Sequence, residues 1–390
     1  MDRVRWRTGS SRRGRPSASG WLFYFMWGLL LVMLVRGVVY LNERGEGKES
    51  GQTQEAAMTA TAGEEGVQES AEPAIAQKKP VQDKPASGQA AAGQEEAKSA
   101  KALSAYDRMW VNVYLTEEKR IEKMPIELYV RGVLAGEMPI DFELEALKAQ
   151  AIAARTYIYK RLLQQDRSGL GDEAKQADVN DTVMNQVYVS LSQLLSRWSG
   201  TDKEANLAKL NEAVEQTKGQ IVTYDGEPIQ ASFFSTSNGY TENASDYWDM
   251  DLPYLRSVAS PWDKTISPKY KETVTMSLKA FSAKLGVKKS AVSQMRILDT
   301  TEGKRIKTVL IGRDKFSGRE IREKLGLASS QFHWTILDDE IRITTFGYGH
   351  GVGMSQWGAN GMAMKGQTAD QILAHYYTGT KLEKAAGLLD

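Results

Sequence analysis

The stretch that decides the fold, residues 127–161, reads ELYVRGVLAGEMPIDFELEALKAQAIAARTYIYKR. In its second half, apolar residues recur three and four positions apart, at Leu144, Leu147, Ala151, Ala154 and Ile158. This spacing places side chains along one stripe of an α-helix. The stretch therefore predicts an amphipathic helix that begins near Leu144.

The start of this helix is marked by residue types with known positional preferences. Pro139 is unfavourable inside a helix, and Asp141 is a suitable N-cap residue. Glu143 and Glu145 then place negative charge in the first turn, where the helix dipole favours it.

A second helix is expected just before it, over residues 126–135 and weakened at Gly136. Glu137 then falls at the junction between two helices, where side chains are exposed. Lys148 and Arg155 are seven residues apart, close to two helical turns, so they share one helix face. One carboxyl and two cations are thus predicted to face one space. The alternative is that Glu137 is an ordinary solvated acid near a helix start.

The first 41 residues predict a membrane anchor. Residues 1–20 carry six arginines against the single acid Asp2, and residues 21–41 are almost wholly apolar apart from Arg36. An apolar run of roughly twenty residues crosses the hydrocarbon core of a bilayer as a helix. Positive charge on its N-terminal side places a basic tail in the cytoplasm and the rest outside, as a single-pass protein of the cell membrane. A cleaved signal peptide is the alternative.

Residues 42–105 predict a disordered linker. The segment contains no aromatic residue and is dominated by Glu, Gln, Ala, Gly, Lys and Ser. Such a composition buries too little apolar surface to offset the entropy of ordering. The linker would let the part that follows stand off the membrane and search a volume.

Residues 106–385 are expected to form a folded extracytoplasmic region of the α+β class. Residues 109–115 alternate apolar and polar side chains as a strand does. The chain contains no cysteine, which excludes disulfides, thiolate metal ligands and a thiol nucleophile. Its net charge of +1 gives no electrostatic support to nucleic-acid binding.

Beyond the long helix we expect a loop over residues 164–182, a helix over residues 193–215 and a hairpin around the turn Asp225-Gly226, with strands 221–224 and 228–234. A polar loop follows, rich in hydroxyl and amide side chains and closed by two aromatic residues. Hydrogen-bonding groups beside aromatic rings suit a sugar, and an ordinary turn-rich loop is the alternative. The side chains of this loop include Ser237, Asn238, Tyr240, Tyr247 and Trp248.

Residues 266–345 are expected to form a smaller α+β subdomain without catalytic residues. It should hold a helix near residues 279–285, a hairpin over 297–312, a helix stopped by Gly326, and a last hairpin over 332–346.

The closing motif, residues 347–380, is GYGHGVGMSQWGANGMAMKGQTADQILAHYYTGT. Its first glycines flank His350 and leave the backbone free to adopt positive φ. It lacks the Gly-Lys-Ser/Thr ending of a phosphate loop. We expect a helix over residues 354–365 and a second from Thr368, where Gln371 completes a capping box. A lone histidine in such a loop is as often structural as functional.

Three stretches, in this order, resemble the stage II sporulation protein D family, which also includes amidase enhancer proteins. They are VRGVLAGEMP with LKAQAIAARTY, FFSTSNGYTENASDYW with PYLRSV, and GYGHGVGMSQWGA with ILAHYYTGT. The resemblance extends from about residue 106 to about residue 382. It implies a peptidoglycan lytic transglycosylase that cleaves between N-acetylmuramic acid and N-acetylglucosamine, on strands stripped of stem peptides, during engulfment in sporulation.

The resemblance also implies roles for individual residues. Glu137, in GEMP, matches the family's catalytic glutamate. The candidate substrate-binding residues are Lys148, Arg155, Tyr240, Ser237, Asn238 and His350. The first three match positions that the family uses around its active cleft. Some family members carry a zinc bound partly by cysteine, and because this chain has no cysteine we expect neither a metal nor another cofactor.

One well-placed carboxyl suffices for the implied reaction. Hydrolysis of a glycoside usually needs two carboxylates, whereas here the 6-hydroxyl of muramic acid attacks the anomeric carbon and leaves a 1,6-anhydro end. Glu137 would protonate the leaving oxygen and then accept the proton of the 6-hydroxyl, which requires a pKa raised by desolvation. We expect Lys148 and Arg155 to bind the lactyl carboxylate that removal of the stem peptide leaves.

Two alternatives to catalysis stay open at this point. The protein could be a glycan-binding activator of a cell-wall amidase, or a scaffold in an engulfment complex. The implied partners are glycan strands, the peptide-stripping amidase called stage II sporulation protein P, and the membrane protein called stage II sporulation protein M.

Overall fold

The computed structural model describes residues 104–198, 200–248 and 250–388. The predicted cytoplasmic tail, membrane anchor and nearly all of the predicted linker lie outside these residues. Within the described part of the chain, none of the helices combines the length and apolar character needed to cross a membrane. The architecture is a mixture of helices and small sheets, so the α+β class is confirmed.

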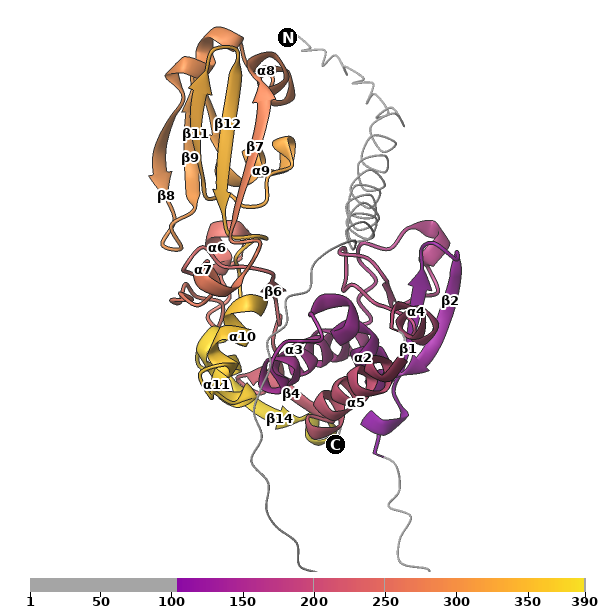
Figure 1. The fold of residues 1–390 in the computed structure, drawn as a ribbon. Helices are drawn as coiled ribbons and strands as arrows, with labels where there is room; N and C mark the ends of the chain where they lie inside the picture. Colours follow the sequence, from indigo (N-terminus) through magenta and orange to yellow (C-terminus); the bar gives the residue numbers. More distant parts are fainter. Residues whose placement is uncertain (1–103, 199, 249, 389–390) are drawn as a thin grey trace, which may run out of the picture. The chain divides into compact units, whose positions relative to one another are not determined.

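Helix α3, Leu144–Leu163, is the central element (Figure 1). The predicted stripe is buried except at Leu144, which is half-buried, but Ala149, Ile152 and Ala153 also have no exposed surface. A helix buried on most of its faces is a core helix rather than an amphipathic surface helix, so the prediction of an amphipathic helix is wrong. Its main neighbours are α2 (Ile126–Glu137), α5 (Gly200–Gln216), α10 (Gln356–Ala363), α11 (Ala369–Tyr376) and strand β4 (Gln220–Tyr224).

Tertiary contacts fix the start of α3. The N-cap residue is Glu143 and not the predicted Asp141, and no side chain caps this end. The backbone N–H of Glu143 instead donates to the side-chain oxygen of Asn360 in α10. The carboxylate of Glu145 accepts a hydrogen bond from the backbone of Ala369, at the start of α11. The first turn of α3 is therefore held by the C-terminal helices.

Three small sheets surround this helical core. Strands β1 (Trp110–Leu115) and β2 (Arg120–Pro125) form an antiparallel hairpin, and β3 (Val179–Asn180) adds to β1 in parallel. The other two sheets are β14 (Lys381–Lys384) with β4 and β5 (Glu227–Pro228), and β6 (Phe233–Phe234) with β13 (Met354–Ser355). The short helices are α4 (Leu191–Arg197), α6 (Ala244–Tyr247) and α7 (Asp263–Ile266), and 3-10 turns lie at Tyr106–Arg108, Asp172–Ala174, Lys289–Gln294 and Ala385–Leu388.

The predicted hairpin around Asp225-Gly226 is confirmed at its turn. Both residues have positive φ, 50° and 81°, as a two-residue hairpin turn of the primed type requires. The second predicted strand is interrupted, because only residues 227–228 and 233–234 pair, and with different partners. The helix predicted over residues 193–215 is divided between α4 and α5.

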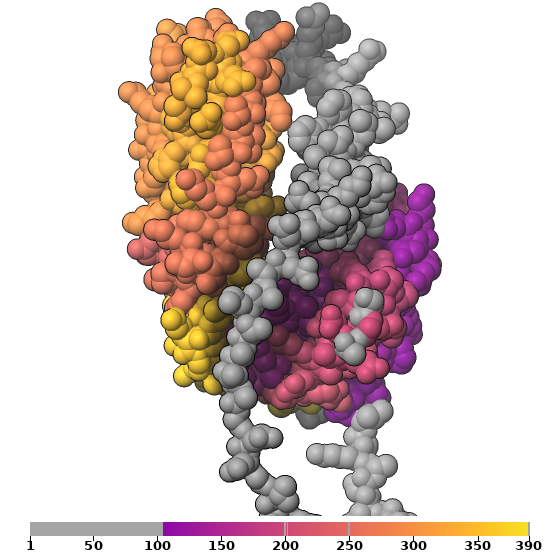
Figure 2. All heavy atoms as spheres, in the orientation of Figure 1, coloured from indigo at the N-terminus to yellow at the C-terminus, as the bar shows by residue number. Residues whose placement is uncertain are grey.

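A third group of elements lies between Lys271 and Phe346, with its own apolar core around Phe281, Val309 and Ile343. Two three-stranded sheets, ordered β11-β12-β7 and β10-β9-β8, pack with two helices. Figure 2 shows one face of this group, where β12 lies beside β7. The elements are β7 (Lys271–Ser277), α8 (Leu278–Leu285), β8 (Arg296–Thr300), β9 (Ile306–Ile311), β10 (Asp314–Ser317), α9 (Gly318–Leu325), β11 (Phe332–Leu337) and β12 (Glu340–Phe346).

The helices and hairpins predicted in this group are confirmed, and strands β7 and β10 were not predicted. Gly326 ends α9 with φ of 70°, the left-handed conformation expected of a helix stop. At the C-terminal end of the chain, the capping box of Thr368 and Gln371 opens α11 as predicted.

A buried ion pair joins α2 to α3. Arg155 has no exposed surface, and its Nη2 lies 2.7 Å from Oε2 of Glu127. The same guanidinium donates to the backbone oxygen of Gln220, and Glu127 also accepts hydrogen bonds from the Tyr106 hydroxyl and the Gly219 backbone. The pair therefore fixes the start of α2 against α3 and against the connection from α5 to β4.

We predict that Arg155→Met lowers the free energy of unfolding by about 3–5 kcal/mol, because it leaves the Glu127 carboxylate partly buried without its cation. Chemical denaturation of the full chain measures this loss. The double variant Arg155→Met/Glu127→Gln should lose less than the single variant, since it removes the uncompensated charge. A single variant as stable as the wild type would show that the pair does not hold α2.

Candidate active site

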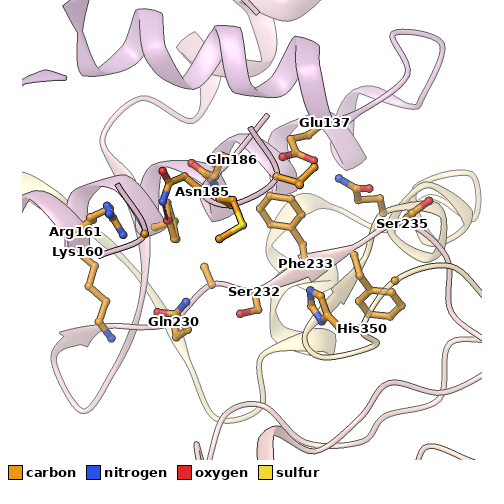
Figure 3. Close-up of a pocket in the computed structure, with 18 of the residues that line it drawn as sticks. Glu137, Lys160, Arg161, Asn185, Gln186, Gln230, Ser232, Phe233, Ser235 and His350 are labelled. Carbon is orange, nitrogen blue, oxygen red and sulfur yellow. Dashed lines mark hydrogen bonds between the residues drawn. The ribbon is translucent and has the colours of Figure 1, made fainter. Parts of the chain in front are cut away.

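A cavity of about 720 Å³ brings together the end of α2, the second half of α3, residues 183–186, the segment that contains β6 and the glycine-rich residues 348–350. Figure 3 shows Lys160 and Arg161 at one end of it and Glu137 with Ser235 at the other. Phe233 and His350 form part of the wall near Glu137. Two of the sequence-predicted site residues, Glu137 and His350, thus meet in this cavity.

Glu137 is the last residue of α2, at the helix junction that was predicted. Its Oε1 accepts a hydrogen bond of 2.7 Å from the backbone N–H of Val187. Burial raises the pKa of Glu137 to about 7, and the Val187 N–H and the Gln356 amide act in the opposite direction. Both protonation states are therefore populated at neutral pH, as a group that serves in turn as general acid and general base requires.

Two glycines of α2 let the segment that carries Val187 lie against the helix. A Cβ atom at Gly132 would lie 2.2 Å from the Tyr188 ring, and one at Gly136 would lie 2.4 Å from the Val187 carbonyl oxygen. Any larger residue at either position would push the segment away. The backbone N–H of Val187 reaches Glu137 because neither glycine has a side chain.

His350 lies within an aromatic enclosure. The rings of Phe234, Tyr247 and Trp248 have their centroids within 5.6–5.7 Å of the imidazole. Burial, and then the nearby cations Arg322 and Arg305, lower the pKa of His350 to about 3. Its Nδ1 accepts a hydrogen bond from the backbone of Val352. The imidazole is therefore neutral at physiological pH and acts as a rigid polar part of the wall.

Ser237 lies in a buried hydroxyl network away from the cavity lining. The carboxylate of Asp263 accepts hydrogen bonds from the backbone and hydroxyl of Ser237 and from the hydroxyls of Ser260 and Ser355. Asp263 itself has no exposed surface. This network connects the polar loop to the segment before α10. Ser237 therefore holds the loop in place and does not face the cavity.

Asn238 and Tyr240 lie outside the residues that line the cavity. The Asn238 amide donates to the Gly303 carbonyl in the turn between β8 and β9, and its oxygen accepts from the backbone of Tyr240. Glu242 of the same loop pairs with Arg305, both with 2 % of the side chain exposed. The Tyr240 ring is 42 % exposed. The polar loop thus binds the β8–β9 hairpin.

The prediction that Lys148 and Arg155 face one space with Glu137 is wrong. Lys148 forms an ion pair of 2.6 Å with Glu145, and Arg155 is buried against Glu127. Neither residue lines the cavity. The spacing argument considered one helix surface alone, whereas Lys148 pairs within α3 itself and Arg155 pairs with Glu127 of α2.

Several residues in the cavity wall or directly behind it had no signal in the sequence. Val187 contributes a backbone N–H, which any residue except proline supplies. Gln186 and Arg322 belong to segments that showed no catalytic pattern, and Arg322 comes from the group of elements where none was expected. Gln356 lies within the quoted stretch GYGHGVGMSQWGA, and its polar side chain beside a helix start was the signal that could have identified it.

The acids that line the cavity, among the described residues, are Glu137 and Asp166. Asp166 forms an ion pair with Arg161 and accepts a hydrogen bond from the backbone of Ser168, which lowers its pKa. The cavity thus offers one carboxyl that is free to exchange a proton near neutral pH. Within residues 104–388, apart from the two undescribed positions, there is no cluster of three or more His, Cys, Asp or Glu residues placed to hold a metal.

Comparison with known proteins adds to this geometry. Residues 114–224 match the protein family described as Stage II sporulation protein. The chain is 48 % identical over 294 residues to stage II sporulation protein D of Bacillus subtilis (strain 168), an alignment that covers 75 % of this chain and 84 % of that protein. It is 49 % identical over 280 residues to the protein of the same name from Bacillus amyloliquefaciens, covering 72 % and 80 %. It is 30 % identical over 307 residues to the amidase enhancer of Bacillus subtilis (strain 168), covering 65 % and 40 %.

We predict that Glu137→Gln stabilises the protein above pH 7. Because the folded state raises the pKa of Glu137 from 4.5 to about 7, deprotonation of the native protein is unfavourable, and its stability falls as the pH rises between these values. The variant should exceed the wild type by about 2 kcal/mol at pH 8, a figure reduced for the partial exposure of the carboxyl, and match it at pH 4. Denaturation at both pH values measures the difference. The exposed Glu143→Gln is the control, and an equal effect at both pH values would contradict the raised pKa.

Proposed function

The chain belongs to the stage II sporulation protein D family, a family of sporulation proteins, and from this premise we propose that it is a peptidoglycan lytic transglycosylase. The proposed reaction cleaves the bond between N-acetylmuramic acid and N-acetylglucosamine in peptide-stripped strands. The observation that supports it most directly is the position of Glu137, whose pKa is raised to about 7 at the wall of a cavity large enough for sugar rings.

The distribution of acids favours an intramolecular attack over hydrolysis. A hydrolase usually needs a second carboxylate as base or nucleophile, and Asp166 is held by Arg161. In the proposed reaction Glu137 donates its proton to the leaving oxygen as the glycosidic bond breaks. The resulting carboxylate then takes the proton of the 6-hydroxyl of muramic acid as that oxygen bonds to the anomeric carbon. The products are a free 4-hydroxyl and a 1,6-anhydro end.

We assign recognition of the stripped strand to Lys160 in place of Lys148 and Arg155. Removal of the stem peptide leaves a lactyl carboxylate on each muramic acid, which a cation can bind. Among the cavity-lining cations of the described chain, Arg161 and Arg322 already donate hydrogen bonds to backbone oxygens, whereas the Nζ of Lys160 has neither a hydrogen bond nor an ion pair and is attracted only at longer range by Glu227. Burial lowers the pKa of Lys160, so an anionic partner would restore favourable interactions to its ammonium group.

The cellular setting is part of the same proposal. Residues 21–41 would anchor the protein in the membrane, with the catalytic region on the outer side. A peptidoglycan amidase, stage II sporulation protein P, would supply stripped strands, and stage II sporulation protein M would complete a membrane complex for engulfment. The similarity to an amidase enhancer supports an amidase as partner.

We predict that the full chain converts peptide-stripped glycan strands to fragments with 1,6-anhydro-muramic acid ends, and that Glu137→Gln forms none. Mass spectrometry identifies these fragments, because each is lighter by one water than a hydrolysis product. The variant keeps the size of the side chain and its acceptor oxygen, but its amide cannot act as a general acid. Binding of strands by the variant serves as the control for folding.

The activator hypothesis gives a different pattern in the same experiment. If both proteins bind the strands without cleaving them, and an added amidase then releases stem peptides faster, the protein is a glycan-binding activator and not a transglycosylase. Hydrolysis products would instead identify the protein as a glycosidase with a second catalytic carboxylate.

We predict that Lys160→Met reduces the preference for stripped over peptide-bearing strands by about fivefold, equivalent to about 1 kcal/mol for a partly exposed ion pair. The preference is the ratio of kcat/KM for the two substrates. Lys148→Met, which removes a cation outside the cavity, is the matched control and should leave the ratio unchanged. If the ratio changes in Lys148→Met but not in Lys160→Met, recognition of the lactyl carboxylate would have to be assigned to Lys148 instead of Lys160.

A further inference from the structure

Two glutamine amides in the cavity wall have N–H groups without acceptors. Gln186 is 1 % exposed and Gln356 is 7 % exposed, and both line the cavity that contains Glu137. Across the described residues, the Nε2 atoms of both side chains are buried and have no hydrogen-bond partner. Leaving a buried donor unpaired is unfavourable, so such groups in a cavity indicate where a ligand supplies an acceptor.

The position of Gln186 is fixed by its neighbours. Its Oε1 accepts a hydrogen bond of 3.1 Å from the hydroxyl of Tyr129. Tyr129 is fully buried in α2 and stacks on Tyr188 with the ring centroids 5.7 Å apart. Because the oxygen is engaged, the N–H groups are the part of the amide left for the cavity. Gln186 also precedes Val187, whose backbone binds Glu137, and both Gln186 and Glu137 line the cavity.

Gln356 is held from a different part of the chain. It is the first residue of α10 and follows Ser355, whose hydroxyl caps the helix and donates to the buried Asp263. Its amide is near enough to Glu137 to lower the pKa of the carboxyl, yet its Nε2 makes no regular hydrogen bond. Two donors held by separate parts of the chain therefore line the cavity that contains Glu137.

The chemistry of the donors restricts the ligand group. N–H groups without a competing acceptor suit an oxygen that accepts hydrogen bonds, as a carbonyl oxygen does. An anionic oxygen at this place would repel the carboxylate form of Glu137, which favours a neutral acceptor. On an N-acetylated glycan the strongest neutral acceptor is the carbonyl of the acetamido group. Figure 3 shows the ring of Phe233 near Glu137, an apolar surface for the methyl group.

We propose that Gln186 and Gln356 bind the acetamido carbonyl oxygen of the sugar at the cleavage point, so that the site selects N-acetylated over de-N-acetylated strands. The inference rests on the proposed function for the identity of the glycan. It adds a specificity determinant, because an enzyme could cleave the same bond without recognising this group. Loss of N-acetyl groups from the strand would then protect it from this protein.

The test is binding by isothermal titration calorimetry, which does not depend on cleavage. The probes are a peptide-stripped oligosaccharide, the same oligosaccharide after de-N-acetylation, and a third sample in which the freed amines are N-formylated. We expect the full-length wild type to bind the first and third at least tenfold more tightly than the second, because both retain the carbonyl. Equal binding of all three by the wild type would overturn the proposal without any variant.

Gln186→Met and Gln356→Met remove the two amide donors with little change in volume, and Gln186→Met also removes the acceptor of the Tyr129 hydroxyl. Each should weaken binding of the N-acetylated probe by about tenfold and leave the de-N-acetylated probe unaffected. Gln230→Met is the matched control, since Gln230 lines the same cavity and Figure 3 places it away from Glu137. If the two Met variants bind both probes more weakly by the same factor, the two glutamines have only a structural role and the proposal is overturned.

The outcomes separate the inference from the proposed function. Discrimination by the carbonyl, together with an absence of anhydro products, would retain the amide site in a glycan-binding protein and reject the transglycosylase. Anhydro products formed equally from N-acetylated and N-formylated strands are expected. Anhydro products formed equally well from de-N-acetylated strands would keep the transglycosylase and reject the amide site.

Discussion

The buried ion pair between Glu127 and Arg155 is the interaction on which the site depends, because it fixes the helix that carries the reacting carboxyl. Glu127 lies in the first turn of α2, and Glu137 ends the same helix about 15 Å further along. A displacement at the start of a rigid helix is transmitted to its end. Arg155 acts on the site through α2 without lining the cavity.

The protonation state of Glu137 results from opposing contributions, of which burial is the largest. Burial raises its pKa, whereas the N–H of Val187 and the amide of Gln356 stabilise the charged form. Had the cations of α3 faced the carboxyl, as the spacing of Lys148 and Arg155 suggested, its pKa would have fallen and the proton would be absent at neutral pH. The burial of these cations in pairs with Glu145 and Glu127 is therefore a condition for a neutral acid.

The sequence predicted what depends on local patterns and failed where distant segments meet. The junction at Glu137, the turn at Asp225-Gly226 and the capping box of Thr368 each depend on a few adjacent residues, and each is confirmed. The hydrogen bond from Val187 to Glu137 joins residues fifty positions apart through a backbone group that carries no sequence signal. Helix periodicity likewise identified α3 but did not reveal that other elements cover nearly all of it.

In the polar loop, too, the sequence did not reveal which distant residues the side chains bind. Ser237, Asn238 and Glu242 have the composition of a sugar-binding loop, but partners far along the chain occupy them: Asp263, the β8–β9 turn and Arg305. Composition gives the hydrogen-bonding capacity of a segment and not the identity of the partner. Only the folded structure shows which donors are left without acceptors. It identifies the side-chain N–H groups of Gln186 and Gln356 as such donors.

The distribution of charge along the cavity favours one register of the proposed glycan substrate. The contributions that set the pKa of Glu137 include no cation, and Arg322, the lining cation near the neutral His350, already donates to two backbone oxygens. Lys160 and Arg161 lie at the other end (Figure 3). A strand with regularly spaced carboxylates gains attraction when one of them reaches Lys160, and it avoids repulsion when none lies beside Glu137. The same arrangement that keeps the acid protonated therefore favours one register of the glycan, in which a neutral acetal and acetamido group meet the carboxyl and the amides.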